Sequence, residues 1–514
     1  MQSTDPFTSL SPRLRACADL QVAEVRENAG RHEYDGVVQD LSPAGVRAGL
    51  AALGEGGPLA DPFDDGYLTA VEAGLRTSLG DFEDHRRNPI WHISNLELAC
   101  YDRTYAPEGE REQARRRHLA SWPDAVGAAV EALDRVPAPV ARSLLPAASG
   151  LLPASVRADE DDPVVAAARH AHERFLAHLR HAAAGGPPEA TLGGAALSRM
   201  LGASEGLQVD LGRLALAADA ERDRLRALLD RACARLDGGT APRLVVRRLL
   251  SDYPSTPEQI YAEARALIAE TTAFTVRAGL LAHPGGECLV GPAPESRRWA
   301  MAMMSWAAPY EADAPSWYHV TPPDPAWPQS EREDWLAVFS RTTLPAITVH
   351  EVTPGHYAHG RMLRRLTSDV RRTFGSTAFT EGWAHYVEEL FIEEGFRDGD
   401  PRYAIGAAIE ALIRVTRLAV SIGIHTGAHD VAEGARRFEV DAFLRGPAAR
   451  AEAERATFDP TYGRYTWGKM VIRDLQGAAR QAWGSSYSHL RFHNALLSLG
   501  APPLGLVSEA VRVG

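Results

Sequence analysis

Apolar residues recur every three to four positions through much of the chain, which is the spacing of an amphipathic α-helix. The clearest example is LGRLALAADAERDRLRALLDRACARL, residues 211–236. Residues that favour helix starts precede several such runs: Ser42 stands before Pro43, and Thr256 stands before Pro257. The pattern therefore predicts a mainly helical protein.

Residues 283–342 interrupt this pattern, because Pro, Gly and aromatic residues replace the helical spacing. We expect two short strands here, at 287–290 and 317–321, forming a small β-sheet next to the helix that follows near residue 344. The free edge of such a strand can pair with an extended, peptide-like substrate. Tyr318, in the second strand, is a candidate for substrate binding. The alternative is a structural hairpin that covers the core.

Gly and Pro cluster in AAAGGPPEATLGG, which begins at residue 182 and is typical of a linker. We place a boundary here, between an N-terminal helical lobe (1–185) and a lobe that contains the candidate metal-binding residues described below (186–514). The same stretch also suits a surface loop within one continuous domain.

Charge and cysteine content exclude several classes of protein. The 55 Lys and Arg residues against 67 Asp and Glu residues give a formal charge of −12, and a phosphate-binding surface needs a basic excess, so we expect no nucleic-acid partner. No apolar run reaches membrane-spanning length, so we expect no membrane contact. The four cysteines lack CxxC spacing, and the N-terminus lacks the pattern of a signal peptide. We therefore expect a cytoplasmic protein with reduced thiols.

Candidate chemistry lies in TLPAITVHEVTPGHYAHGRMLRRL, residues 343–366. His350 and His356 offer imidazoles to a metal ion, and Glu351 is placed to take a proton from metal-bound water, as in zinc hydrolases. Zinc is the expected ion, with Fe²⁺ or Mn²⁺ as alternatives. The opposing interpretation is that a His-Glu pair arises by chance in a chain of this length.

The spacing of the two histidines demands a distorted helix. Zinc-binding helices usually space them four apart, whereas His350 and His356 are six apart. On a regular helix, six steps of about 100° place the two rings on nearly opposite sides. Pro354 interrupts a helix and Gly355 accepts unusual dihedrals. We therefore predict a π-type bulge at 353–355 that turns the second ring back towards the first.

The third ligand should be a carboxylate from another helix, and Glu381 in FTEGWAHYVEELFIEEG is the best candidate. Glu381, His385 and Glu388 fall at i, i+4 and i+7, on one face of a helix. His385 or Glu388 then orients a ligating histidine. Gly382 permits another backbone to approach closely. Whether His359 or His385 also joins the ligands is left open by the sequence.

Downstream residues supply candidates for substrate contacts. Residues 402–435 suggest one further helix, from which Arg417 can hold a substrate carboxylate and His425 can stabilise an oxyanion. Tyr465 and Lys469 lie one turn apart on a later helix. Tyr465 is the candidate oxyanion donor, or else a core tyrosine with a satisfied hydroxyl. Lys469 is a further candidate for substrate binding.

The run HEVTPGH followed by TEGWAHYVEEL resembles the HExxPGH…EGWAxYxE signature of the bacterial family named domain of unknown function 885. GRHEYDGVVQDLSPAG, RLAVSIGIHTGAH, YTWGKMVIRDL and RFHNALLSLGAPPL resemble other parts of that family, so the similarity covers most of the chain. The family is similar to gluzincin metallopeptidases, which implies His350, His356 and Glu381 as ligands and Glu351 as the base. Ser421, where the family usually has Asp, and the shorter segment DPTYGRY depart from its pattern and concern the substrate side.

These observations predict a mainly α protein with a large helical gluzincin-like fold, a small β-sheet beside the metal-binding helix and a deep central cleft. The expected function is zinc-dependent hydrolysis of an amide bond in a small peptide or an amino-acid-derived metabolite, with Glu351 as general base. Two alternatives remain. The first is a non-haem iron or other metal enzyme of a biosynthetic pathway, since such enzymes use the same set of two histidines and one carboxylate. The second is an inactive helical binding scaffold. The substrate and the oligomeric state are beyond the sequence.

Overall fold

The computed structural model describes residues 10–153, 156, 162–312 and 314–514. Residues 1–9, on which part of the signal-peptide prediction rests, lie outside them. The described chain is mainly helical, as the hydrophobic pattern predicts, and it contains a small sheet of three strands, of which two were predicted.

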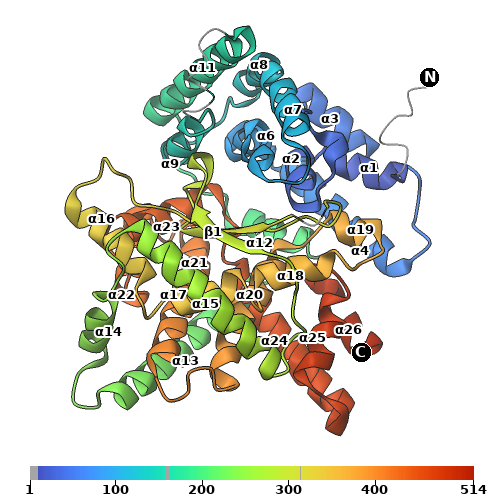
Figure 1. The fold of residues 1–514 in the computed structure, drawn as a ribbon. Coiled ribbons are helices and arrows are strands. Elements are labelled where there is room, and N and C mark those ends of the chain that lie inside the picture. The colour runs from blue at the N-terminus through green and yellow to red at the C-terminus, as the bar shows by residue number, and fades with distance from the viewer. Residues whose placement is uncertain (1–9, 154–155, 157–161, 313) are drawn as a thin grey trace.

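Most of the helices before residue 186 lie in the upper part of Figure 1, above the sheet. Helices α6 to α9 and α11 share one buried apolar cluster there. The bounds of these first helices are α1 Pro12–Asp19, α2 Val22–Glu24, α3 Pro43–Ala52, α4 Pro62–Leu75, α5 Asp84–Arg87, α6 Ile90–Leu96, α7 Glu108–Ala120, α8 Trp122–Ala132, α9 Ala138–Ser149 and α11 Pro163–Gly185.

The remaining helices pack below and around the sheet in Figure 1. Their bounds are α12 Gly194–Ala203, α13 Leu211–Leu236, α14 Pro242–Leu250, α15 Pro257–Arg277, α16 Gln329–Leu336, α17 Leu344–Glu351, α18 His356–Leu363, α19 Asp369–Thr373, α20 Thr377–Glu393, α21 Arg402–His425, α22 Val431–Asp441, α23 Gly446–Phe458, α24 Arg464–Trp483, α25 His489–Leu497 and α26 Glu509–Val513. The predicted boundary after residue 185 falls at the end of α11. The division into two lobes stays a prediction.

The helix starts follow the sequence signals. The Ser42 hydroxyl accepts a hydrogen bond from the Gly45 amide at 3.0 Å, and the Thr256 hydroxyl accepts one from the Gln259 amide at 3.3 Å. Each side chain pairs an amide that the first turn of the helix leaves without a backbone partner. Helix α13 has the bounds predicted from its apolar spacing.

The sheet consists of β1 Cys288–Pro292, β2 Ala302–Ser305 and β3 Ser316–Val320. Strand β3 lies in the middle, parallel to β1 and antiparallel to β2. The two predicted strands are confirmed to within two residues at each end. Strand β2 was not predicted, because its four residues, AMMS, are too few and too uniformly apolar to show an alternating pattern.

The prediction of one helix over 402–435 is wrong. The chain forms two helices, α21 and α22, because Gly427 takes a left-handed conformation (φ +77°) just after α21. The Asp430 side chain then accepts a hydrogen bond from the Glu433 amide at 2.7 Å and starts α22.

Helices α17, α20 and α24 lie at the centre of the part of the molecule below the sheet in Figure 1. All eight residues of α17 are buried. A Cβ added at Gly382 of α20 would lie 2.5 Å from the carbonyl carbon of Gly468 in α24, so the two helix backbones are in direct contact. The close approach predicted at Gly382 is therefore confirmed, and it fixes the position of the neighbouring Glu381.

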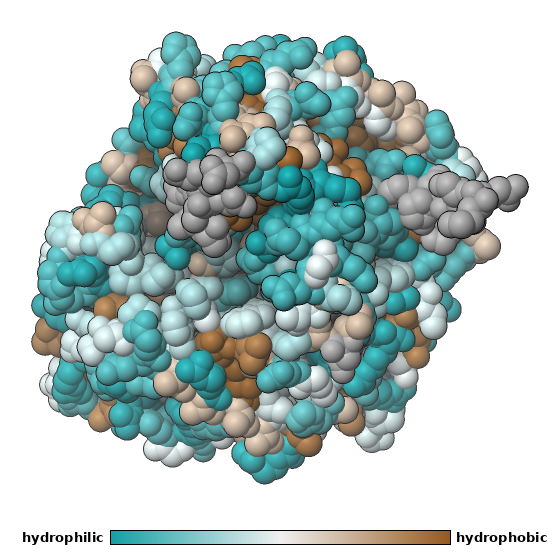
Figure 2. All heavy atoms as spheres, turned by 45° about the horizontal axis from the view of Figure 1, so that its top comes forward, coloured by the Kyte–Doolittle hydropathy of each residue, from teal (hydrophilic) through white to brown (hydrophobic). Residues whose placement is uncertain are grey.

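Among the described helices, none combines the length and the apolar character needed to cross a membrane. The face shown in Figure 2 is mainly hydrophilic, with hydrophobic side chains in small groups.

The four cysteines are free thiols. Three of them are buried (Cys17, Cys100 and Cys233), and Cys288 is half-buried.

Candidate metal centre

The chain breaks between the two candidate histidines. Helix α17 ends at Glu351 and α18 begins at His356, with a cis Thr353–Pro354 bond between them. A Cβ added at Gly355 would lie 1.8 Å from the His350 carbonyl oxygen, so only glycine fits there. The predicted distortion is at the predicted place, but it is a break between two helices and not a π-type bulge within one.

Hydrogen bonds hold this turn against α17 and α20. The Gly355 amide donates to the Val349 carbonyl at 3.1 Å, and the Ala358 amide donates to the Val352 carbonyl at 3.1 Å. The Trp383 indole donates to the Pro354 carbonyl at 3.0 Å, from inside the core. The second histidine is therefore positioned by a fixed turn.

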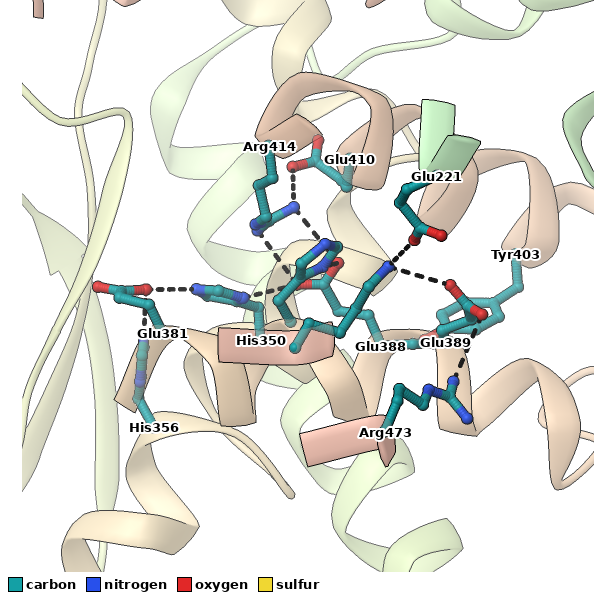
Figure 3. A network of polar contacts seen from close by, with 12 residues as sticks. Glu221, His350, His356, Glu381, Glu388, Glu389, Tyr403, Glu410, Arg414 and Arg473 are labelled. Carbon is teal, nitrogen blue, oxygen red and sulfur yellow. Dashed lines mark hydrogen bonds and ion pairs between the residues drawn. The ribbon is translucent and has the colours of Figure 1, made fainter. Parts of the chain in front are cut away.

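The break brings three candidate ligands together (Figure 3). The Nε2 atoms of His350 and His356 each lie 3.3 Å from Oε2 of Glu381. The ligand atoms of the three residues all lie within 4.8 Å of one another, and the two rings are nearly perpendicular, at 84°. Among the described His, Cys, Asp and Glu side chains, these three form the one group that could hold a metal ion.

The spacing fits a bound cation. Two ligand atoms about 2.1 Å from one tetrahedral zinc ion lie about 3.4 Å from each other, close to the distances found here. Direct charged hydrogen bonds would be shorter, about 2.7–2.9 Å. The buried Oε2 atom of Glu381 has no hydrogen bond to a described residue. Burial disfavours the charged carboxyl, but His356 and His350 outweigh it and hold the pKa of Glu381 well below its usual range.

Glu351 lies beside the three ligands and faces the same cavity. It is 6% exposed, and its Oε2 atom has no hydrogen bond within the described part of the chain. Burial raises the pKa of Glu351. A buried carboxylate without a partner is costly unless it has a task, so this residue is a candidate base.

Behind His350, polar side chains form a buried network (Figure 3). Nδ1 of His350 lies 2.6 Å from Oε1 of Glu388, and Glu388 in turn pairs with Arg414 at 3.1 Å. Arg414 also pairs with Glu410 at 3.2 Å. The orienting role predicted for Glu388 thus has the required geometry. His385 lies one step further away, with Nδ1 at 3.5 Å from Glu388.

The three ligands and Glu351 lie in the wall of a cavity of about 720 Å³. The chain before residue 100 contributes Trp91 and Asn95 to this wall, and the residues around β2 contribute Trp299 and Met304. The cavity is therefore lined by residues from the N-terminal helices and from the part of the chain after residue 186, and its volume suits a small molecule or a short peptide.

Tyr465 and Arg417 line the cavity next to the ligands. The Tyr465 ring is stacked at 6.3 Å from the His350 ring, and its hydroxyl accepts a hydrogen bond from Arg455 at 3.2 Å. Nε and Nη2 of Arg417 donate to the carboxylate of Glu452 at 2.6 Å each.

A sequence model of the family described as "Bacterial protein of unknown function (DUF885)" matches residues 25–511. The chain belongs to this family. The predicted resemblance is confirmed at the level of the family. No curated protein sequence matches the chain.

Two solved structures share the fold of this DUF885 protein. One is "a putative lipoprotein of unknown function" from Shewanella oneidensis, with 18% identity, coverage of 97% of both chains and a TM-score of 0.74. The other is a "putative lipoprotein" from Colwellia psychrerythraea, with 15% identity, coverage of 99% of both chains and a TM-score of 0.76. At these identities the similarity shows the fold alone.

Three residues of the DUF885 protein that were predicted to act in catalysis or substrate binding lie away from the cavity. His425 is fully buried, and its Nε2 atom contacts the Ala456 carbonyl at 2.9 Å. Lys469, one turn beyond Tyr465, is buried in ion pairs with Glu221 and Glu389. The predicted catalytic role of His425 and the predicted substrate contact of Lys469 are therefore wrong, because tertiary packing directs both side chains into the core.

Tyr318 is also misassigned. It is fully buried in the apolar core, where its strand β3 is covered on both edges by β1 and β2. It does not line the cavity.

His359 is buried as well and contacts the Gly500 carbonyl at 3.1 Å, so neither His359 nor His385 joins the three candidate ligands.

No role was predicted for Arg455, Arg464 or Asp459, all of which line the cavity. The available signal was the segment DPTYGRY, which departs from the family pattern and carries Asp459 and Arg464 next to Tyr465.

Proposed function

We propose that this protein is a metal-dependent hydrolase, with a gluzincin-like fold and a deep central cleft, that cleaves an amide bond in a small peptide or an amino-acid-derived compound. The observation that carries the proposal is the convergence of His350, His356 and Glu381 beside Glu351 in the cavity wall. Two imidazoles and one carboxylate form a common catalytic zinc site with an open position.

His350, His356 and Glu381 would hold the ion. When bound, a zinc ion polarises a substrate carbonyl and lowers the pKa of a coordinated water. Glu388 accepts the Nδ1 proton of His350, which leaves Nε2 of that ring free to act as a ligand.

Glu351 is the proposed general base. It takes a proton from the attacking water and passes it to the leaving amine. Burial raises the pKa of Glu351, which suits a group that must both accept and return a proton near neutral pH.

Tyr465 is the proposed donor to the developing oxyanion. Because Arg455 donates to the Tyr465 oxygen, the hydroxyl proton of Tyr465 is free to point into the cavity. A fixed donor at this position stabilises negative charge on the carbonyl oxygen more in the transition state than in the ground state.

The edge strand β2 supports a peptide-like substrate. Ala302, Met303 and Met304 line the cavity, and β2 pairs with β3 on one side only. An extended substrate can therefore add to the sheet through its backbone.

The proposal is tested by elemental analysis and by a dipeptide library. We expect about one equivalent of zinc and hydrolysis of at least one dipeptide class. Glu351→Gln should keep the metal and lose at least about 10²-fold in kcat. His356→Ala is the matched control that should lose the metal. Full activity of Glu351→Gln would exclude the assigned base.

The same analysis separates the alternatives. Iron in protein purified without oxygen, with no hydrolysis, would favour the non-haem iron enzyme, since that class uses two histidines and one carboxylate. Absence of any bound metal would favour the inactive scaffold. The cytoplasmic location stays a prediction that cell fractionation tests.

A further inference from the structure

Three arginines from three helices meet in the cavity wall next to Tyr465. Arg417 lies on α21, Arg455 on α23 and Arg464 at the start of α24. The Cζ atom of Arg417 lies 4.8 Å from the centre of the Tyr465 ring, and that of Arg455 lies 5.7 Å from it. The other neighbour of this ring is the candidate ligand His350, so one aromatic side chain separates the arginines from the metal centre.

The acids paired with these arginines leave one positive charge without a partner. Glu452 balances Arg417 through two hydrogen bonds of 2.6 Å. A single carboxylate, Asp459, is shared by Arg455, at 2.9 Å, and Arg464, at 3.0 Å. Two guanidinium groups, that of the buried Arg455 and that of the half-buried Arg464, thus share one carboxylate. Such an excess is costly until an anion binds.

Arg455 is fixed by its neighbours and keeps one hydrogen-bond donor without a partner among the described residues. It is 7% exposed, and its Cζ atom lies 5.1 Å from the centre of the Trp299 ring and 5.7 Å from that of the Tyr462 ring. Its hydrogen bonds to described residues, Asp459 and Tyr465, use Nε and Nη2. Nη1 is the donor left over.

Arg464 also has a donor to spare. Its Nη1 donates to the Thr461 hydroxyl at 2.5 Å and its Nη2 donates to Asp459. Its buried Nε atom has no hydrogen bond to a described residue. Two guanidinium groups that share one carboxylate and line the same cavity suit the planar oxygens of a second carboxylate.

Another acid in the cavity wall is Glu24 on α2. It lines the same cavity, and no ion pair joins it to a residue in the described ranges. Glu24 is an exposed residue of the cavity wall. Glu24 therefore does not supply a fixed counter-ion for the arginines.

We propose that Arg455 and Arg464 bind a free carboxylate of the substrate, on the amino acid released by cleavage. The substrates are then acylated amino acids or short peptides cut at their last amide bond. This inference rests on the proposed hydrolase function. Arg417 is a positioning residue, because Glu452 occupies its fork and its guanidinium packs on the Tyr465 ring.

The test compares dipeptides of the form Ala-X with the matching Ala-X-amides. With the zinc-loaded protein we expect kcat/KM for the acid to exceed that for the amide by about 10²-fold, mostly through KM, since a charged hydrogen-bonded contact is lost. Equal kcat/KM values for acid and amide would overturn the proposal. Binding of the same pairs to the Glu351→Gln protein, measured by calorimetry, gives the preference without turnover.

Variants assign the preference to the two arginines. Arg464→Gln and Arg455→Lys should each reduce the acid-to-amide ratio to less than about one tenth of the wild-type value, because each variant removes one of the two guanidinium groups that hold the carboxylate. The control is Arg480→Gln, an exposed arginine on the same helix as Arg464, which should leave the ratio unchanged. Thermal unfolding of each variant shows whether it is folded.

The two proposals fail in different ways. If no acid or amide is hydrolysed, but the acids bind to the Glu351→Gln protein more tightly than their amides, the carboxylate site stands and the hydrolase function is wrong. If hydrolysis occurs and no acid binds or reacts better than its amide, the hydrolase function stands and the carboxylate site is wrong.

Discussion

The Nδ1 atom of His350 and the Oε1 atom of Glu388 lie 2.6 Å apart in the buried layer behind the candidate ligands. Glu388 is held by Arg414, at 3.1 Å. Ligating histidines commonly donate their second ring N–H to a carboxylate, which fixes the ring and the tautomer. This pair therefore sets which nitrogen of His350 faces the other ligands.

Removing the charge of Glu388 should weaken metal binding. We expect Glu388→Gln to lower zinc affinity by about 10–100-fold, since such supporting partners have effects of that size. Competition with a chromophoric chelator measures the affinity. Glu389→Gln is the matched control: Glu389 is the neighbouring buried acid, and it pairs with Lys469 and not with a candidate ligand. An equal effect of both variants would contradict the role of Glu388.

Removing the hydroxyl of Tyr465 should affect turnover and not metal content. If Tyr465 donates to the oxyanion, Tyr465→Phe lowers kcat by about 10²–10³-fold, as loss of such a donor does in other enzymes. Steady-state kinetics and elemental analysis on the same preparation check this. An unchanged kcat would make Tyr465 a wall residue of the cavity.

The contact of α20 with α24 predicts opposite effects of two glycine substitutions on one helix. A Cβ at Gly468 would lie 2.0 Å from the Ala378 carbonyl oxygen, so Gly468→Ala should cost at least about 1–3 kcal/mol of unfolding free energy. At Gly477 nothing lies within 4 Å, so Gly477→Ala should stabilise by about 0.5–1 kcal/mol. Urea unfolding measures both. Destabilisation by Gly477→Ala would show that the difference does not come from the helix contact.

The raised pKa of Asp84 predicts how the free energy of unfolding depends on pH. Burial raises the pKa of Asp84 to about 7 from 3.8. Between these values the folded protein holds a proton that the unfolded chain releases, so this residue lowers stability as pH rises from about 4 to 7. Asp84→Asn should remove the loss and gain about 2–4 kcal/mol above pH 7. Urea unfolding of both proteins from pH 5 to 8 should show a difference that grows with pH, and a constant difference would contradict the assignment.

The convergence of the candidate ligands could be predicted, because the sequence features that indicate it lie close together in the chain. His350, His356 and Pro354-Gly355 lie within seven residues, and the arithmetic of the helix demands a break between the rings. Glu381 and Glu388 share one helical face, so their common direction follows from spacing alone.

The substrate side could not be predicted in the same way. Lys469 and Tyr465 also share a helical face, but α24 passes out of the cavity within one turn, and the ion pairs of Lys469 with Glu221 and Glu389 come from other parts of the chain. The proposed carboxylate-binding role of Arg464 depends on the fact that Arg464 shares Asp459 with Arg455. Such relationships arise from tertiary packing and leave no periodic pattern in the sequence.

The break at Gly355 also limits how such a site can evolve. On a regular helix, adding one residue to a pair of histidines spaced four apart rotates the second ring by about 100° away from the first. Any residue larger than glycine at this position would collide with the His350 carbonyl, at 1.8 Å. The longer spacing and its glycine must therefore be acquired and inherited together.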